Sequence, residues 1–306
     1  MRQLLLLTIC SVLLGCQFSK KEISTTSGFL EINGSQVYYK TIGEGEPLVI
    51  VHGGPVMDHS YLLPHLEELA KDYQLILYDQ RACGRASVEV QVATMNLDGF
   101  VEDIEQIRQA LKLEKINLLG HSWGGLLAMK YGIKYPENLN HLILSNSIAP
   151  SVADWQLEGG RVSERATNKD RQDRQAIMES GALQSENPSK AIEKLLRISF
   201  RPQMYDTTNL SKLNLYVPQD YMQRSQVFGL LGPDLANFNL YSDLKKVTCP
   251  TLVVYGSEEP ATSLHAQKMT DSFSNGQLSI IQKSGHFPFV ENQKQFFAAV
   301  QSFLKK

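Results

Sequence analysis

The sequence predicts an α/β fold with a mostly parallel central sheet, helices on its faces and an inserted helical segment. Apolar runs typical of buried strands alternate with segments of helical periodicity as far as Pro150. Two more strand–helix units follow from residue 251, while residues 151–243 are richer in charge and mostly helical in pattern. We therefore expect a core of residues 28–150 and 244–306, with residues 151–243 forming a lid over it.

The expected elements follow in order. Asn33-Gly34 separates two β-rich runs and signals a hairpin. Later strands are expected over 47–53, 73–79, 115–122, 139–147, 251–257 and 277–285. Helices are expected over 64–73, 97–113, 124–135, 263–272 and 292–306. Pro64 suits the first turn of its helix, and apolar residues recurring every three or four positions give the helix over 97–113 one buried face.

The first residues differ in kind from the rest. Residues 1–16 hold one Arg, an apolar run too short to span a bilayer comfortably, and a terminal Cys. We expect 1–15 to be a signal peptide; an uncleaved anchor is the alternative. The ending LLGC resembles a bacterial lipobox, which implies lipidation of Cys16 and a lipid-anchored envelope protein, with Gln17 favouring the outer membrane. Residues 17–27 are polar and lack periodicity, so we expect residues 16–27 to form a tether.

Composition excludes several function classes. A chain of 306 residues, 42% of them hydrophobic, can form a core without disulfides. Its net charge of -2 and the lack of a long basic run argue against nucleic-acid binding. Cys83 and Cys249 fit no disulfide framework and are expected to be small buried residues. With no H-E-x-x-H and no Cys/His/Asp cluster in the sequence, we expect neither a metal nor a cofactor.

The stretch GHSWG, residues 120–124, fits G-x-S-x-G between a predicted strand and a predicted helix. A nucleophilic serine must stand clear of the backbone, and flanking glycines allow the sharp turn that achieves this. N–H groups at the start of the helix also favour a developing oxyanion. We therefore predict Ser122 as a nucleophile; a turn that only caps the helix is the alternative.

A nucleophilic serine needs a histidine base and an acid, in the chain order Ser, acid, His. His286 follows the last predicted strand and is the predicted base, because the other histidines precede the lid, flank the serine or lie on a predicted helix. Glu258 and Glu259 both follow the strand over 251–257, and the pattern alone leaves the acid open between them. The HGGP loop predicts Gly54 as one oxyanion donor beside Trp123, with a plain turn as the alternative.

Together these motifs resemble the α/β-hydrolase fold and, within it, the proline iminopeptidase group of serine peptidases. HGGP, LYDQRACGRAS, GHSWGGLLA and SGHFPFVEN occur in that group's order and at similar spacing. The resemblance implies Glu259 as the acid. It also implies an aminopeptidase that releases N-terminal residues from small peptides through an acyl-enzyme. A carboxylesterase or lactonase of the same fold is the alternative.

The sequence departs from the pattern of that group in two ways. Val56 and Ala82 stand where the group has glycines in HGGPG and DQRG, so we expect reshaped loops near the oxyanion hole. The group's lid also carries acidic residues that hold the substrate's amine, one of them in a Gly-Pro-x-Glu-Phe segment. Residues 232–238 contain no Glu. Asp234 and Glu193 are the candidate replacements, although each is also typical of a surface charge.

Overall fold

The computed structural model describes residues 23–54 and 56–306; the predicted signal peptide and Cys16 lie outside them. Eight strands form one sheet in the order β1-β2-β4-β3-β5-β6-β7-β8. The strands are β1 Thr25–Ile32, β2 Ser35–Ile42, β3 Glu46–Val51, β4 Tyr73–Tyr78, β5 Ile116–His121, β6 Leu139–Ser145, β7 Thr251–Gly256 and β8 Gly276–Ile281. From β4 to β8 all neighbours are parallel, which confirms the predicted fold class.

The first two strands form the predicted hairpin. Asn33 and Gly34 both have positive φ, 50° and 73°, which the tightest hairpin turns require. The hairpin begins earlier than expected, because Thr25 pairs with Ile42 of β2. Residues 25–27, predicted as part of the tether, therefore belong to the sheet. The backbone hydrogen bonds of an antiparallel pair hold them there despite their polar side chains.

Alternate residues of each central strand feed two separate cores. In β3, Val49 and Val51 join the core under α1 Leu97–Ala110, α2 Trp123–Lys134 and α9 Ala266–Asp271. Leu48 and Ile50 join the core on the other face, under α11 Gln293–Leu304. This is the pattern of a sheet buried on both faces. Cys83 and Cys249 are free and buried, as predicted.

Two predicted helices differ from the prediction. Residues 64–73 form no α-helix; a 3₁₀ helix, η2 Glu67–Lys71, lies there instead, and another, η1 His59–Leu62, precedes it. Leu63, Leu66 and Leu69 are buried at intervals of three residues, which is the repeat of a 3₁₀ helix. The helix expected over 263–272 is divided into α8 Pro260–Leu264 and α9, because His265 between them leaves helical geometry and its ring is buried.

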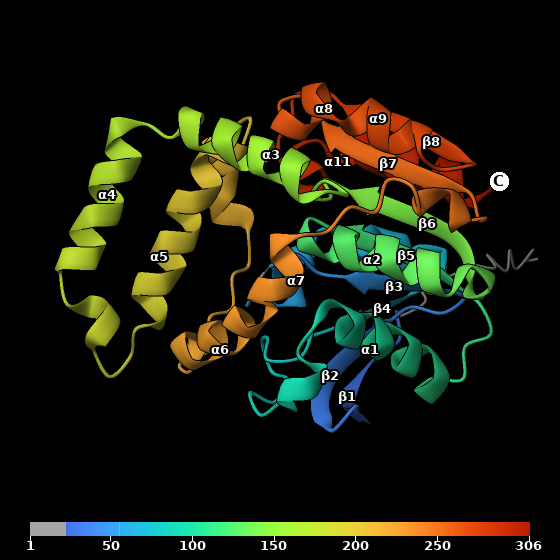
Figure 1. Ribbon diagram of the computed structural model, residues 1–306, viewed down its shortest axis with the longest axis horizontal. Coiled ribbons are helices and arrows are strands. Elements are labelled where there is room, and N and C mark those ends of the chain that lie inside the picture. Colours follow the sequence, from blue (N-terminus) through green and yellow to red (C-terminus); the bar gives the residue numbers. More distant parts are fainter. Residues whose placement is uncertain (1–22, 55) are drawn as a thin grey trace, which may run out of the picture.

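The segment between β6 and β7 is helical, and Figure 1 shows α4 and α5 farthest from the sheet. Its helices are α3 Val152–Arg165, α4 Asn168–Glu179, α5 Ser189–Phe200, α6 Tyr221–Phe228 and α7 Gly232–Ala236. The two ends of this lid meet at a short antiparallel ladder that we call the neck, residues 150–152 and 238–240. Val152 donates its N–H to Phe238 O at 3.0 Å, and Leu240 to Pro150 O at 2.7 Å.

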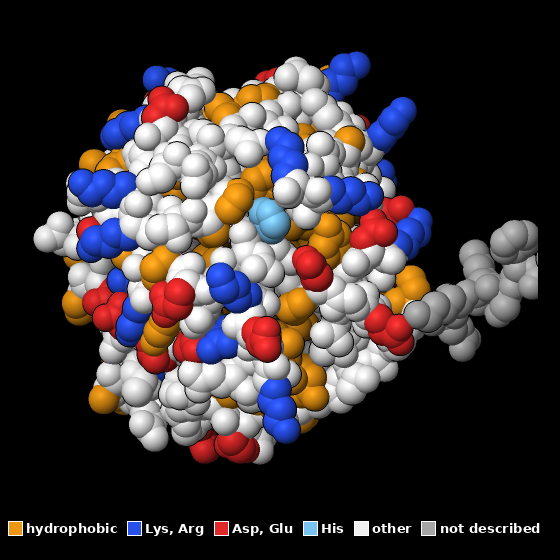
Figure 2. Space-filling model, turned by 90° about the vertical axis from the view of Figure 1, so that its right-hand side faces the viewer, with side chains coloured by type: hydrophobic (Ala, Val, Ile, Leu, Met, Phe, Trp, Pro, Cys, Tyr) orange, Lys and Arg blue, Asp and Glu red, His pale blue; other side chains and the backbone are white. Residues whose placement is uncertain are grey.

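The surface agrees with the small net charge. Figure 2 shows one face on which basic and acidic side chains are interspersed. Among residues 23–54 and 56–306, no helix combines the length and the apolar character that crossing a bilayer requires.

Candidate active site

Ser122 lies at the turn between β5 and α2 and has φ 55° and ψ -122°. Positive φ is strained for a residue with a side chain, and such strain concentrates at functional sites. The turn depends on close backbone approach: a Cβ on Gly124 would lie 2.2 Å from Val51 O, and one on Gly120 2.4 Å from Gly124 O. Glycine is thus required on both sides of the serine for a physical reason.

A cavity of about 270 Å³ lies over this turn. It is lined by Gly54, Ser122, Trp123, Ile148, Trp155, Glu158, Gly159, Val162, Gln203, Leu231, Leu235, Glu259 and His286. The strand ends and the loop after β8 form its floor, and α3 and α7 of the lid form much of its wall. The structure therefore brings together in one cavity all five residues predicted to act in catalysis.

The loop after β8 holds His286 against Glu259. His286 Nδ1 lies 3.2 Å from Glu259 Oε2, which leaves Nε2 free of that contact. Asn146 Nδ2 donates to the same carboxylate oxygen at 3.3 Å and to Gly285 O at 3.0 Å. Glu258 is exposed, and its side chain contacts Ser257. The geometry thus distinguishes the two adjacent acids, which the sequence pattern did not.

His121 has a role that the sequence analysis did not assign to it. Gly53 donates its N–H to Tyr61 Oη at 2.7 Å, and Tyr61 in turn donates to His121 Nδ1 at 2.6 Å. His121 Nε2 donates to His286 O at 2.9 Å. Burial lowers the pKa of His121 well below its ordinary value, so the ring is neutral and can accept at Nδ1. It joins the loop after β3 to the loop that carries His286.

Gln80 connects the loop after β3 to the serine turn. Its backbone N–H donates to His52 Nε2 at 3.1 Å, and its side-chain amide donates to His52 O at 2.7 Å. Its amide oxygen accepts from Trp123 Nε1 at 3.0 Å. Burial lowers the pKa of His52 to about 4, which keeps Nε2 an acceptor. The DQR segment thus fixes the positions of Gly54 and Trp123, the two predicted oxyanion donors.

A strained serine turn between a strand and a helix, a histidine–carboxylate pair and a fixed glycine loop are the parts expected of an α/β-hydrolase. The family model described as alpha/beta hydrolase fold matches residues 46–293. The chain belongs to the α/β-hydrolase fold family. It is a hydrolase of that family.

The relatives of this α/β-hydrolase include peptidases. It is 30% identical over 287 residues to a proline iminopeptidase of Heyndrickxia coagulans, covering 91% of this chain and 98% of the relative. It is 29% identical over 297 residues to one of Clostridioides difficile (strain 630), covering 91% and 98%. The crystal structure of a proline iminopeptidase from Mycobacterium smegmatis superimposes with a TM-score of 0.67 at 21% identity, covering 92% of this chain and 98% of that one.

At the two positions where the proline iminopeptidase group has glycine, this hydrolase keeps a backbone conformation that favours glycine. Val56 has φ 61° and Ala82 has φ 56°, both in the left-handed region. That conformation costs a residue with a Cβ about 1 kcal/mol or more. The side chains at both positions are buried. Both positions therefore carry a buried side chain on strained backbone, and the expected reshaping of these loops stays a prediction.

One group of potential metal ligands exists in the described part of the hydrolase. Asp58, His59 and Asp79 bring ligand atoms within 4.8 Å of one another. Arg85 Nη1 donates to Asp58 Oδ2 at 2.7 Å and to Asp79 Oδ2 at 3.5 Å. His59 Nδ1 lies 2.5 Å from Asp79 Oδ1. Because an arginine and a histidine already pair with these carboxylates, the group forms an internal ion-pair network.

The two acids proposed to hold a substrate amine do not line the cavity. Asp234 lies on α7, and its carboxylate accepts the backbone N–H of Leu97 at 2.6 Å at the start of α1. Acidic side chains are favoured at that position by the helix dipole. Glu193 lies on α5 and pairs with Arg197 one turn further, at 2.8 Å. Both carboxylates are thus engaged away from Ser122, and this part of the prediction was wrong.

The lid acid that does line the cavity is Glu158 of α3, which is 8% exposed. One carboxylate oxygen bonds His265 Nε2 and the other accepts the N–H of Ala149 at 3.4 Å. Burial raises the pKa of Glu158, and the negative charge of Glu259 adds to the effect. Its position could have been found from the sequence, because Trp155, Glu158 and Val162 share one helix face at intervals of three and four.

Proposed function

We propose that the protein is a serine aminopeptidase of the proline iminopeptidase type. The relatives at about 30% identity along most of the chain support this activity. The observation that carries the proposal is Glu158, a buried carboxylate in the same cavity as Ser122. Its carboxylate bonds His265 and the N–H of Ala149, yet each carboxylate oxygen can accept a further hydrogen bond, so the side chain can also receive a substrate ammonium from the cavity that it lines.

The proposed chemistry begins with Ser122 Oγ, which attacks the carbonyl carbon of the substrate's first residue. His286 takes the serine proton at Nε2, and Glu259 stabilises the resulting imidazolium through Nδ1. The N–H groups of Gly54 and Trp123 hold the oxyanion. When the tetrahedral intermediate collapses, His286 returns the proton to the leaving amine. Water then hydrolyses the acyl-enzyme by the same route and frees the serine.

The substrate's first residue fits the remaining walls of the cavity. Trp155, Ile148, Leu231 and Leu235 supply apolar surface for a small side chain or ring. In the proposed complex the free ammonium group of that residue pairs with Glu158. A charged hydrogen bond in a desolvated cavity both orients the substrate and rejects a blocked amine.

Glu158→Gln is expected to raise KM for prolyl arylamide and to lower kcat/KM by about 10- to 100-fold, since the charged hydrogen bond is lost. Turnover of a p-nitrophenyl acyl ester, which has no amine, should change little. Acetylation of the prolyl amine should abolish turnover by the unmodified enzyme. If blocked and free substrates react equally, the enzyme does not require a free amine and the proposal is wrong.

The pH dependence gives a second measure of the same interaction. As pH falls through the raised pKa of Glu158, its carboxylate gains a proton and loses the charge that holds the ammonium. The ratio of kcat/KM for the arylamide to that for the ester should therefore fall on the acid side. Any effect of pH on the chemistry common to both substrates cancels in this ratio. In Glu158→Gln the ratio should be low and independent of pH.

We also propose that the mature protein is held at the cell envelope by a lipid on Cys16, a proposal supported by the sequence of residues 1–16. Several acyl chains anchor a protein stably, whereas a single chain binds a membrane only marginally. Cys16→Ser should therefore move activity from the membrane fraction to the soluble fraction without lowering kcat. Activity that stays in the membrane fraction would favour an uncleaved anchor.

A further inference from the structure

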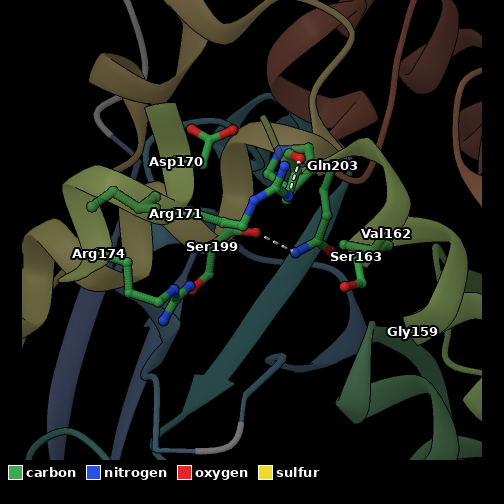
Figure 3. Close-up of a pocket in the computed structure, with 11 residues that line it drawn as sticks. Gly159, Val162, Ser163, Asp170, Arg171, Arg174, Ser199 and Gln203 are labelled. Atoms are coloured by element: carbon green, nitrogen blue, oxygen red, sulfur yellow. Dashed lines mark hydrogen bonds between the residues drawn. The ribbon is translucent and has the colours of Figure 1, made fainter. Parts of the chain in front are cut away.

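A second cavity of about 390 Å³ lies inside the lid and adjoins the catalytic cavity. The two share Gly159, Val162 and Gln203 as lining residues. Figure 3 shows this second cavity, with Arg171 and Arg174 of α4 on one side, Val162 and Ser163 of α3 on the other, and Ser199 and Gln203 near them. We call it the lid cavity.

The shared residue Gln203 places the lid cavity on the leaving-group side of the catalytic cavity. Gln203 O accepts the backbone N–H of His286 at 2.8 Å. In the proposed reaction His286 delivers a proton to the departing amine, so the departing chain must begin beside His286. From there a peptide can continue past Gln203 into the lid cavity.

Gly159, an exposed residue, lines both cavities. Gly159 lies inside α3, where glycine is about 1 kcal/mol less favourable than alanine. A Cβ at Gly159 would meet nothing within 4 Å, so no close packing contact explains the glycine.

The lid cavity is lined by one acid, Asp170, which pairs with Arg201, and by two exposed arginines, Arg171 and Arg174, that form no ion pair with any carboxylate of the described residues. Arg171 donates to Ala166 O and Asn168 Oδ1, each at 2.6 Å, and Arg174 donates to Ser199 Oγ at 2.7 Å. Apart from Arg165, every other arginine of residues 23–306 pairs with an acidic side chain. A planar guanidinium is suited to bind a carboxylate through two parallel hydrogen bonds.

The length of the lid cavity sets the length of chain that fits. Its lining on α3 runs from Gly159 to Ala166, which at 1.5 Å rise per residue is about 10 Å. An extended peptide covers about 3.3–3.6 Å per residue, so about three residues span this distance.

We propose that the lid cavity binds the leaving-group side of a short peptide, with the peptide's C-terminal carboxylate on Arg174 and Arg171. This proposal rests on the proposed aminopeptidase function. It assigns the substrate class as peptides of about three or four residues with a free C-terminus. Longer chains and C-terminal amides lack a carboxylate at the right distance, and an arylamide does not reach the arginines.

The test compares Pro-Ala-Ala with Pro-Ala-Ala amide, which differ only in the terminal charge. The unmodified enzyme should prefer the free acid by about tenfold in kcat/KM through a lower KM, as expected for one charged hydrogen-bonded contact. Arg174→Gln should remove this preference while leaving the amide and prolyl arylamide unchanged. The control is Arg161→Gln, which removes an exposed arginine of α3 that lines neither cavity and should retain the preference.

The outcomes separate the two proposals. Equal rates for acid and amide, with arylamide still hydrolysed, overturn the lid-cavity proposal and leave the aminopeptidase function standing. Loss of all three activities in Arg174→Gln also overturns it, because the arginine then acts on the fold or the chemistry. If no prolyl substrate reacts with the unmodified enzyme, the function itself fails. Protection of Ser122 from a fluorophosphonate by tri-alanine acid, but not by its amide, would still decide whether the carboxylate is bound.

Discussion

Replacing Ser122 with alanine is expected to lower kcat about 10⁵- to 10⁶-fold, because the acyl-enzyme can no longer form. The residual rate would come from the oxyanion donors and substrate binding alone. KM should stay close to its original value, because neither Glu158 nor the apolar walls of the cavity change. Single-turnover assays with prolyl arylamide measure the loss, and fluorophosphonate labelling of the protein should disappear with it.

The fold should tolerate this replacement. Alanine has a Cβ like serine, so the positive φ at position 122 costs about the same in both proteins. Thermal unfolding of Ser122→Ala should therefore match that of the unmodified protein. If Ser122→Ala keeps full activity, another group is the nucleophile. If it unfolds at a lower temperature than the unmodified protein, the serine side chain stabilises the turn.

The second large effect is expected at Glu259. Glu259→Gln should lower kcat about 10⁴-fold, because the amide cannot stabilise the imidazolium form of His286 or fix its tautomer. Glutamine has nearly the same shape as glutamate, so the cavity should keep its walls. The rate is measured with both the arylamide and the acyl ester, and both should fall equally because the acid serves the chemistry of either substrate.

The neighbouring residue provides a matched control for this prediction. Glu258→Gln removes the same charge one position earlier, from an exposed side chain that does not touch His286. Its kcat should stay within about twofold, as expected for a surface substitution. Equal losses in the two variants would mean that the local negative charge matters rather than the contact with Nδ1, and the assignment of Glu259 would be wrong.

The sequence allowed most of the sheet and the catalytic residues to be predicted. Strands buried on both faces are continuous apolar runs, and the serine turn has a local signature, so both can be recognised within a few residues. His286 was identified from its place after the last strand. The choice between Glu258 and Glu259 depends on which side chain turns inward, which the residue pattern alone does not encode.

The roles of the lid acids could not be predicted, because they depend on contacts between segments that are distant in the sequence. Asp234 and Glu193 were chosen by likeness to lid acids, but each carboxylate has a nearer partner, a helix start for one and Arg197 for the other. The helix periodicity places Glu158 on the same face as Trp155 and Val162, but its role depends on α3 folding over the strand ends, beside His265 from a segment more than a hundred residues later. Burial among distant partners, rather than residue type, decides which acid faces the substrate.

The neck has a consequence for how this protein changes over evolutionary time. Residues 150–152 and 238–240 close the lid on itself, and β6 and β7 pair directly beneath it. The contacts at the neck therefore offset the conformational entropy lost when the two ends of the lid are brought together. This loss grows only slowly with the length of the lid. Insertions, deletions or replacements between the two strands of the neck can therefore alter Glu158, Arg171 and Arg174 while the register of the sheet stays the same.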